Sequence, residues 1–102
     1  MLIIIKLQCI MILIGVIIVP EISRFYGIVI KMFFAGNEHN PPHFHAIYGE
    51  YVGEFEISTL DMLEGDMPTK AQGLIREWGK MYQSELMEIW NSQQFKKLKP
   101  LE

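Results

Sequence analysis

The sequence contains very little cysteine and no excess of positive charge, and both shortages limit what the protein can be. Among 102 residues there is 1 cysteine, Cys9, so a scaffold held together by disulfides is excluded. The 9 Lys and Arg residues are outnumbered by 12 Asp and Glu residues, which gives a net charge of −3. A direct nucleic-acid binder presents positive charge to the phosphates, so this composition disfavours that class.

Hydrophobic residues are concentrated at the start of the chain. In residues 1–19, 16 of 19 are hydrophobic, whereas in residues 20–102 the fraction is 35 of 83. The second fraction is ordinary for a globular domain of this size. We therefore divide the chain into a hydrophobic leader, residues 1–19, and a single small domain, residues 20–102.

The leader is open to three interpretations. A run of about 18–20 apolar residues can cross a bilayer as a helix, so residues 2–19 are a candidate membrane anchor. A wrongly assigned translation start is the second, because 8 of the 19 residues are isoleucine, as in translated AT-rich upstream sequence, and Val19 could be encoded by a GTG start codon. A buried strand or helix is the third.

A secretory signal fits the leader poorly. No Lys or Arg precedes the apolar run, and no cleavage site with small residues follows it. We favour the wrongly assigned start, under which residues 1–18 lie outside the native protein and the domain is cytoplasmic. The alternative is a protein anchored in the membrane through residues 2–19.

The first part of the domain has the patterns of short strands. Residues 28–34 (IVIKMFF) are β-branched and aromatic and follow a glycine, which predicts a strand. Residues 43–57 alternate around a central glycine and predict a β-hairpin. Residues 60–64 are a candidate for a further short strand.

The hairpin has a definite predicted register, because a two-residue turn at Gly49 and Glu50 determines which residues face each other. One face is then aromatic and small, and the other carries two histidines opposite two glutamates. The predicted pairs are Tyr48 with Tyr51, Ala46 with Gly53, Phe44 with Phe55, Ile47 with Val52, His45 with Glu54 and His43 with Glu56.

The end of the chain predicts a helix. Apolar residues recur at steps of three and four over residues 69–94, which is typical of one long amphipathic helix, with Gly79 as the place where it would bend. The expected fold is therefore α+β: a small antiparallel sheet of three to four strands with this long C-terminal helix packed on one face.

All three histidines of the sequence lie within seven residues, at His39, His43 and His45. Imidazole changes its charge near neutral pH and is the commonest metal ligand, so these three are candidate ligands of a divalent metal ion. Their spacing of two residues places His43 and His45 on one strand face. Glu54 and Glu56, on the facing strand, are candidate ligands or acceptors that orient the imidazoles.

Three roles for this cluster remain open, and the first is purely structural. A histidine that faces a glutamate across a strand pair is also an ordinary ion pair of small energetic value. The second role is a metal site. The third is proton transfer or contact with a substrate, with His43, His45, Glu54 and Glu56 as catalytic candidates. The serines lack a nucleophile motif, and neither a phosphate loop nor a dinucleotide fingerprint is present.

Three segments together resemble a known family. They are the run from Pro20 (PEISRFYGIVI), the run from His39 (HNPPHFHA) and, after a glycine-rich hairpin, the run from Leu74 (LIREW). Over residues 20–100 or so the chain resembles the small bacterial domain of unknown function 4160. Members of that family usually begin with Met at the position of Val19, which agrees with a wrongly assigned start.

The resemblance brings no established activity with it. It implies a small cytoplasmic bacterial protein, often encoded beside another small protein in the manner of toxin–antitoxin pairs. Our leading hypothesis is therefore an interaction or regulatory module of toxin–antitoxin-like character, which acts through a small protein partner encoded nearby and contacts it through the helix and the histidine loop. The alternative is a histidine-dependent, metal-assisted nuclease or hydrolase that uses His39, His43 and His45.

Overall fold

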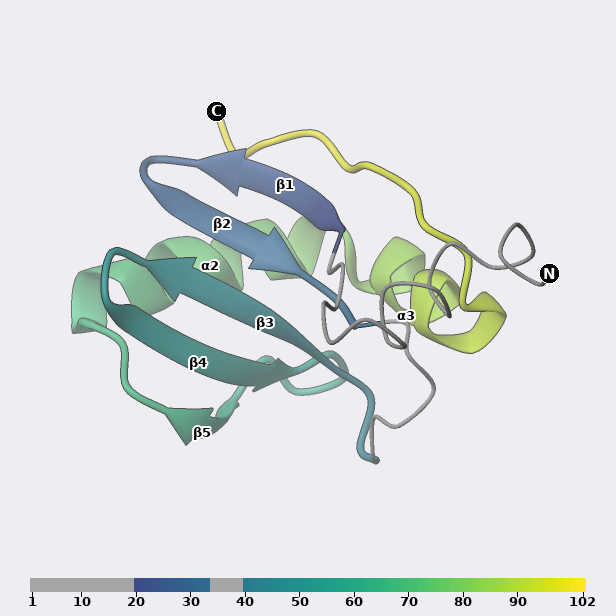
Figure 1. Cartoon of the computed structure of the whole chain (residues 1–102), viewed down its shortest axis with the longest axis horizontal. Helices are drawn as coiled ribbons and strands as arrows, with labels where there is room; N and C mark the ends of the chain where they lie inside the picture. The colour runs from purple at the N-terminus through teal and green to yellow at the C-terminus, as the bar shows by residue number, and fades with distance from the viewer. Residues whose placement is uncertain (1–19, 34–39) are drawn as a thin grey trace, which may run out of the picture.

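The computed structural model of the protein describes residues 20–33 and 40–102. It has an antiparallel sheet with the strands in chain order and two helices after them (Figure 1). The α+β class is therefore confirmed. The elements are β1 (Glu21–Phe25), β2 (Ile28–Lys31), β3 (His43–Tyr48), β4 (Tyr51–Glu56), β5 (Met62–Gly65), α2 (Thr69–Met81) and α3 (Gln83–Ser92).

The predicted hairpin is β3 and β4, and its register is confirmed at all six predicted pairs. Gly49 begins the turn with φ +61°, a left-handed conformation that glycine adopts without strain. Phe44 and Phe55 stack on the inner face, with their ring centroids 5.7 Å apart. The alternation of side chains in the sequence therefore places each histidine and glutamate on the face we expected.

The sheet is larger than predicted, with five strands instead of three to four. The strand that sequence analysis missed is β1, which pairs with β2 through a tight turn at Tyr26 and Gly27. Both turn residues have positive φ, +48° and +81°, the combination that suits a two-residue hairpin. The predicted strand over residues 28–34 corresponds to β2, which ends at Lys31, and the candidate at 60–64 corresponds to β5.

The helical segment expected over residues 69–94 is present, but it is divided into two helices, α2 and α3, instead of one long helix. The break lies at Tyr82, with φ −122° and ψ 22°, and the backbone N–H of Tyr82 donates to the carbonyl of Gly79. Gly79 itself is buried, and a Cβ added there would lie 2.7 Å from Leu60 Cδ2. The absence of a side chain at Gly79 therefore lets α2 approach the loop before β5.

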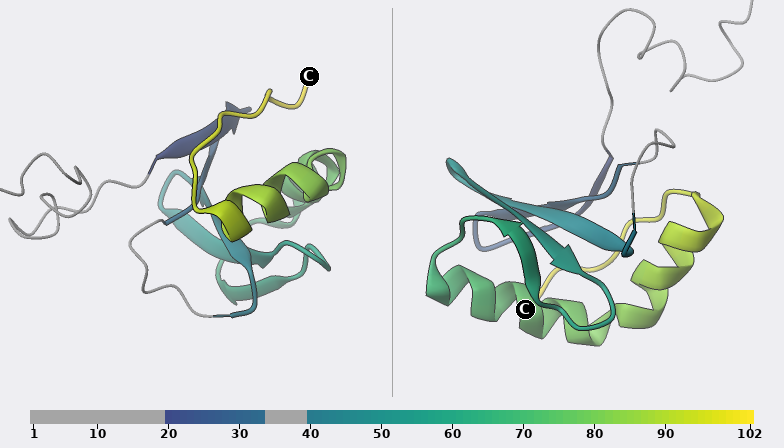
Figure 2. Two further views of the ribbon diagram at one scale, coloured as in Figure 1. Left: turned by 90° about the vertical axis from the view of Figure 1, so that its right-hand side faces the viewer. Right: turned by 90° about the horizontal axis from the view of Figure 1, so that it is seen from below.

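Both helices lie on one side of the sheet, and the core fills the space between them (Figure 2). Trp78 stands at its centre, with its ring centroid 5.5 Å from that of Phe25 and 5.9 Å from that of Phe44. The inward side chains of the helices therefore pack in the core against the sheet. The buried helix residues are Ala71, Ile75, Trp78, Gly79, Leu86 and Ile89.

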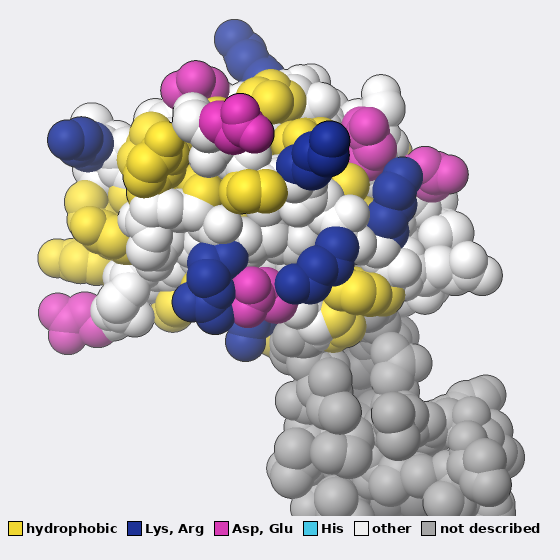
Figure 3. All heavy atoms as spheres, turned by 90° about the horizontal axis from the view of Figure 1, so that it is seen from above, with side chains coloured by type: hydrophobic (Ala, Val, Ile, Leu, Met, Phe, Trp, Pro, Cys, Tyr) yellow, Lys and Arg dark blue, Asp and Glu magenta, His cyan; other side chains and the backbone are white. Residues whose placement is uncertain are grey.

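The segment after α3 returns across the sheet and covers the outer edge of β1. The N–H of Leu98 donates to the carbonyl of Ile22 at 2.9 Å, and the indole N–H of Trp78 donates to the carbonyl of Lys99 at 2.9 Å. Leu98 and Leu101 are buried. Figure 3 views the molecule from this edge, where side chains of both charges alternate with hydrophobic ones.

The hydrophobic leader lies outside the described residues, as does His39. Within residues 20–33 and 40–102, no helix is both long enough and apolar enough to cross a bilayer. The three interpretations of the leader therefore stay predictions.

Candidate functional site

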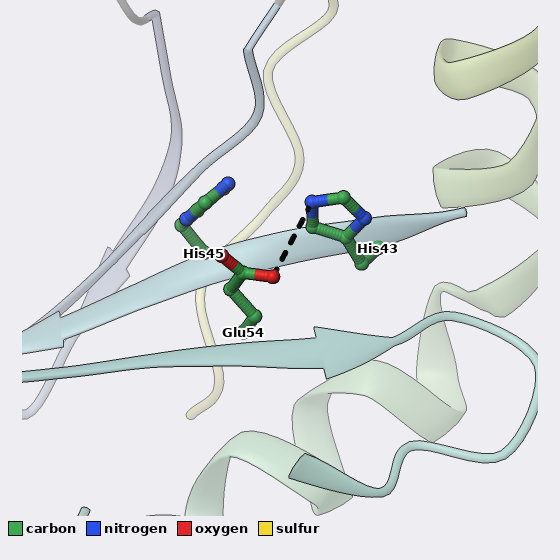
Figure 4. A group of neighbouring side chains, drawn as sticks. All are labelled: His43, His45 and Glu54. Carbon is green, nitrogen blue, oxygen red and sulfur yellow. Dashed lines mark ion pairs between the residues drawn. The ribbon is translucent and has the colours of Figure 1, made fainter. Parts of the chain in front are cut away.

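Three of the candidate site residues meet on neighbouring strands. His43 and His45 are two residues apart on β3, and Glu54 lies directly opposite His45 on β4. One possible ligand atom from each of the three lies within 4.8 Å of the other two. Figure 4 shows the carboxylate of Glu54 turned toward the ring of His43, with the ring of His45 beside it.

His43 is held by its backbone surroundings. Its side chain is 1% exposed, and Nδ1 lies 2.9 Å from the carbonyl oxygen of Pro41. A carbonyl only accepts hydrogen bonds, so Nδ1 carries the proton and donates it. This bond orients the ring and turns Nε2 toward Glu54, whose Oε1 lies 3.7 Å away.

His43 and Glu54 face each other with atoms that can both bind a cation. With the proton on Nδ1, a neutral imidazole presents a lone pair at Nε2, and the carboxylate oxygen opposite it is also an acceptor. A metal ion between the two atoms would accept both lone pairs, so the pair is suited to act as ligands of one ion.

Aromatic rings enclose the histidines. The ring centroid of Trp90, from α3, lies 5.2 Å from that of His43, and that of Phe33 lies 4.4 Å from that of His45. The two imidazoles lie 5.2 Å apart in an edge-to-face arrangement. The packing therefore limits the access of water to His43, whereas the side chain of Glu54 stays 22% exposed.

Glu56 is not part of this cluster, although it pairs with His43 in the strand register. Its carboxylate accepts hydrogen bonds from Ser58 Oγ at 2.7 Å and from Thr59 Oγ1 at 3.2 Å. Glu56 therefore stabilises the loop that follows β4. Of the two predicted glutamates, the structure brings only Glu54 to the histidines.

Ionisable residues extend the site into a row across the whole sheet. Beyond His45 the row continues through β2 to β1, where Arg24 donates hydrogen bonds to the Glu21 carboxylate at 2.9 and 3.1 Å. These hydrogen bonds lower the pKa of Glu21. The row consists of Glu21, Lys31, His45, Glu54 and Glu64.

Sequence analysis missed the groups that orient and cover the cluster. The carbonyl of Pro41 and the ring of Trp90 carry no motif of their own. Trp90 lies 47 positions after His43 in the numbering, so only the packing of α3 reveals the contact. The Asn-Pro-Pro run before β3 was the one available sign of the Pro41 contact. Prolines restrict the backbone of a loop, and the carbonyl that orients His43 belongs to this run.

Comparison with known proteins gives one match. A family model described as a domain of unknown function (DUF4160) matches residues 27–91, which include His43, His45, Glu54 and Trp90. No curated protein and no solved structure matches the chain. The match covers most of the chain, so the protein belongs to the DUF4160 family, a family of domains of unknown function.

Proposed function

We propose that this domain binds a divalent transition-metal ion through His43, His45 and Glu54, and that it uses the ion for hydrolysis. The convergence of two imidazoles and one carboxylate within 4.8 Å is the observation that carries the proposal. Two nitrogen donors and one oxygen donor suit zinc, which we take as the first candidate.

The distances are compatible with this ion. Zinc bonds of about 2.0–2.2 Å in a tetrahedral site place neighbouring ligand atoms about 3.3–3.6 Å apart. His43 Nε2 and Glu54 Oε1 lie 3.7 Å apart, so binding needs a movement of only a few tenths of an ångström for this pair. The ring of His45 has to move further, because the ligand atoms of the three residues are separated by up to 4.8 Å.

The surroundings of His43 also support a metal site. His43 donates through Nδ1 to a backbone carbonyl, an outer interaction typical of metal-binding histidines. Within residues 20–33 and 40–102, three ligands converge and leave a fourth position, which water or substrate takes in catalytic zinc sites and a further protein ligand takes in structural ones. We propose the catalytic arrangement. Zinc lowers the pKa of such a water to about 7, which supplies a nucleophile at neutral pH.

The metal site is tested by competition with a chromogenic chelator and by elemental analysis of the purified full chain. We expect one zinc ion per chain and a loss of affinity of at least about tenfold in His45→Ala and in Glu54→Gln. The matched control is Glu56→Gln, which removes the same charge beside the site and should retain the affinity. Equal affinity in all four proteins would contradict the proposal.

Hydrolysis is tested separately with two general probes, p-nitrophenyl acetate and bis(p-nitrophenyl) phosphate. We expect zinc-dependent turnover of one probe that is lost in Glu54→Gln and retained in Glu56→Gln. If the protein binds zinc but shows no turnover that depends on Glu54, the metal-binding part of the proposal holds and the hydrolase part is ruled out.

A second candidate function is the regulatory module of toxin–antitoxin-like character that acts through a protein partner. The observation that favours it is an exposed, acidic strand at one edge of the sheet, β5 with its flanking residues. It is tested by co-expression with the protein encoded next to this one. Co-purification in a fixed ratio supports this function, and separate elution of the two proteins opposes it.

A further inference from the structure

We propose that the outer edge of β5 binds a basic, extended segment of a partner protein, which adds a sixth strand to the sheet. This inference deepens the second candidate function and is independent of the metal site.

The two edges of the sheet differ in what covers them. At β1, the segment after α3 lies along the edge and donates a backbone hydrogen bond to Ile22. At the opposite edge, β5 pairs with β4 alone among the residues that the structure describes. Leu63, Glu64 and Gly65 of β5 are all exposed. The strand therefore offers unpaired backbone groups along an accessible edge, which is the requirement for strand addition.

The charge of this edge selects the kind of partner. Between Lys31 and Lys70 the sequence contains no Lys or Arg. The charged residues within β5 and directly beside it are all acidic, and a peptide with alternating basic side chains complements them at the spacing of a strand. These residues are Asp61, Glu64 and Asp66.

The same charge disfavours a second copy of this chain as the occupant. Two β5 strands paired with each other would bring Glu64 and its acidic neighbours face to face, and like charges opposite one another destabilise a strand pair. Apolar contact is available to a foreign segment, because Leu63 on β5 is 41% exposed. A basic segment with apolar residues at alternate positions satisfies both features.

The probe is a synthetic octapeptide of alternating lysine and valine, titrated into the full chain and followed by amide chemical shifts. We expect shift changes concentrated in residues 61–66 and binding that weakens as salt is raised. The double variant Glu64→Lys, Asp66→Lys should weaken binding by about tenfold or more. The matched control is the double variant Glu85→Lys, Glu88→Lys on α3, which reverses the same number of charges away from β5. It should change binding by less than about twofold.

Two further measurements separate this inference from its alternatives. His45→Ala should bind the peptide as the unchanged protein does, so failure of the metal site and failure of the edge are distinguishable. Sedimentation of the free chain should show no self-association that depends on β5. Equal binding by both double variants, shift changes away from residues 61–66, or dimers abolished by the β5 reversal would overturn the proposal.

Discussion

His43 and His45 share a strand and a face, yet their surroundings give them different tasks. His43 is buried, hydrogen-bonded to Pro41 and packed against Trp90. His45 is half-buried and lies beside Phe33. We infer that His43 contributes to stability as well as to the site, whereas His45 contributes mainly to the site.

This difference predicts unequal effects on stability when metal is removed by a chelator. His43→Ala should lower the free energy of unfolding by about 2–3 kcal/mol, because it leaves a cavity and deprives the Pro41 carbonyl of its donor. His45→Ala should cost less than about 1 kcal/mol, as expected for a partly exposed position. Urea unfolding followed by circular dichroism measures both, and equal losses would contradict the assignment.

At the scale of elements, Gly79 allows α2 to approach the loop before β5 closely. Gly73 and Gly79 lie in the same helix, but a Cβ at Gly73 would have no neighbour within 4 Å, whereas one at Gly79 would meet Leu60. Leu60 is buried and its carbonyl accepts a hydrogen bond from Arg76, so it has little freedom to move away. Substitution of the two glycines therefore compares two effects within one helix: the gain in helix stability from alanine and the cost of crowding against Leu60.

Alanine at these two positions should have opposite effects. Gly73→Ala should raise the free energy of unfolding by about 0.5–1 kcal/mol, because alanine stabilises a helix relative to glycine. Gly79→Ala should lower it by about 1 kcal/mol or more, because crowding in the core outweighs the same gain. Thermal melting of both variants is the measurement, and a rise in Tm for Gly79→Ala would show that the contact with Leu60 relaxes at little cost.

At the scale of the whole molecule, the C-terminal segment determines that the sheet has one covered edge and one accessible edge. Its two buried leucines, Leu98 and Leu101, and its hydrogen bonds to β1 and to Trp78 attach it to the core. Removal of this segment would expose the edge of β1 and the indole of Trp78. The segment is thus part of the folded domain.

A pair of alanine variants tests the attachment of this segment. Leu98→Ala should destabilise the domain by about 2 kcal/mol, because a nearly buried side chain is lost from the core. Phe95→Ala, in the same segment but 46% exposed, should change stability by less than about 0.5 kcal/mol. Denaturant unfolding compares them, and an effect of Leu98→Ala no larger than that of Phe95→Ala would mean that the segment is not held at β1.

The sequence by itself determined the family, the α+β class and the complete register of the β3–β4 hairpin. These features depend on local patterns: alternation with a period of two, a turn at Gly49, and a histidine run that places His43 and His45 on one face. The convergence of His45 and Glu54 follows from that register alone, so this half of the site was predictable.

Only the tertiary structure decided the remaining features, because they depend on contacts between residues far apart in the chain. Gly79 of α2 packs closely against Leu60 in the loop before β5, and His43 packs against Trp90 of α3. The distinction between Glu54 and Glu56 is of another kind, because Glu56 accepts hydrogen bonds from Ser58 and Thr59, two and three residues along the chain, and Glu54 faces His43. The local periodicity of the sequence predicts on which face of the sheet a side chain lies, and tertiary packing determines which residues that side chain contacts.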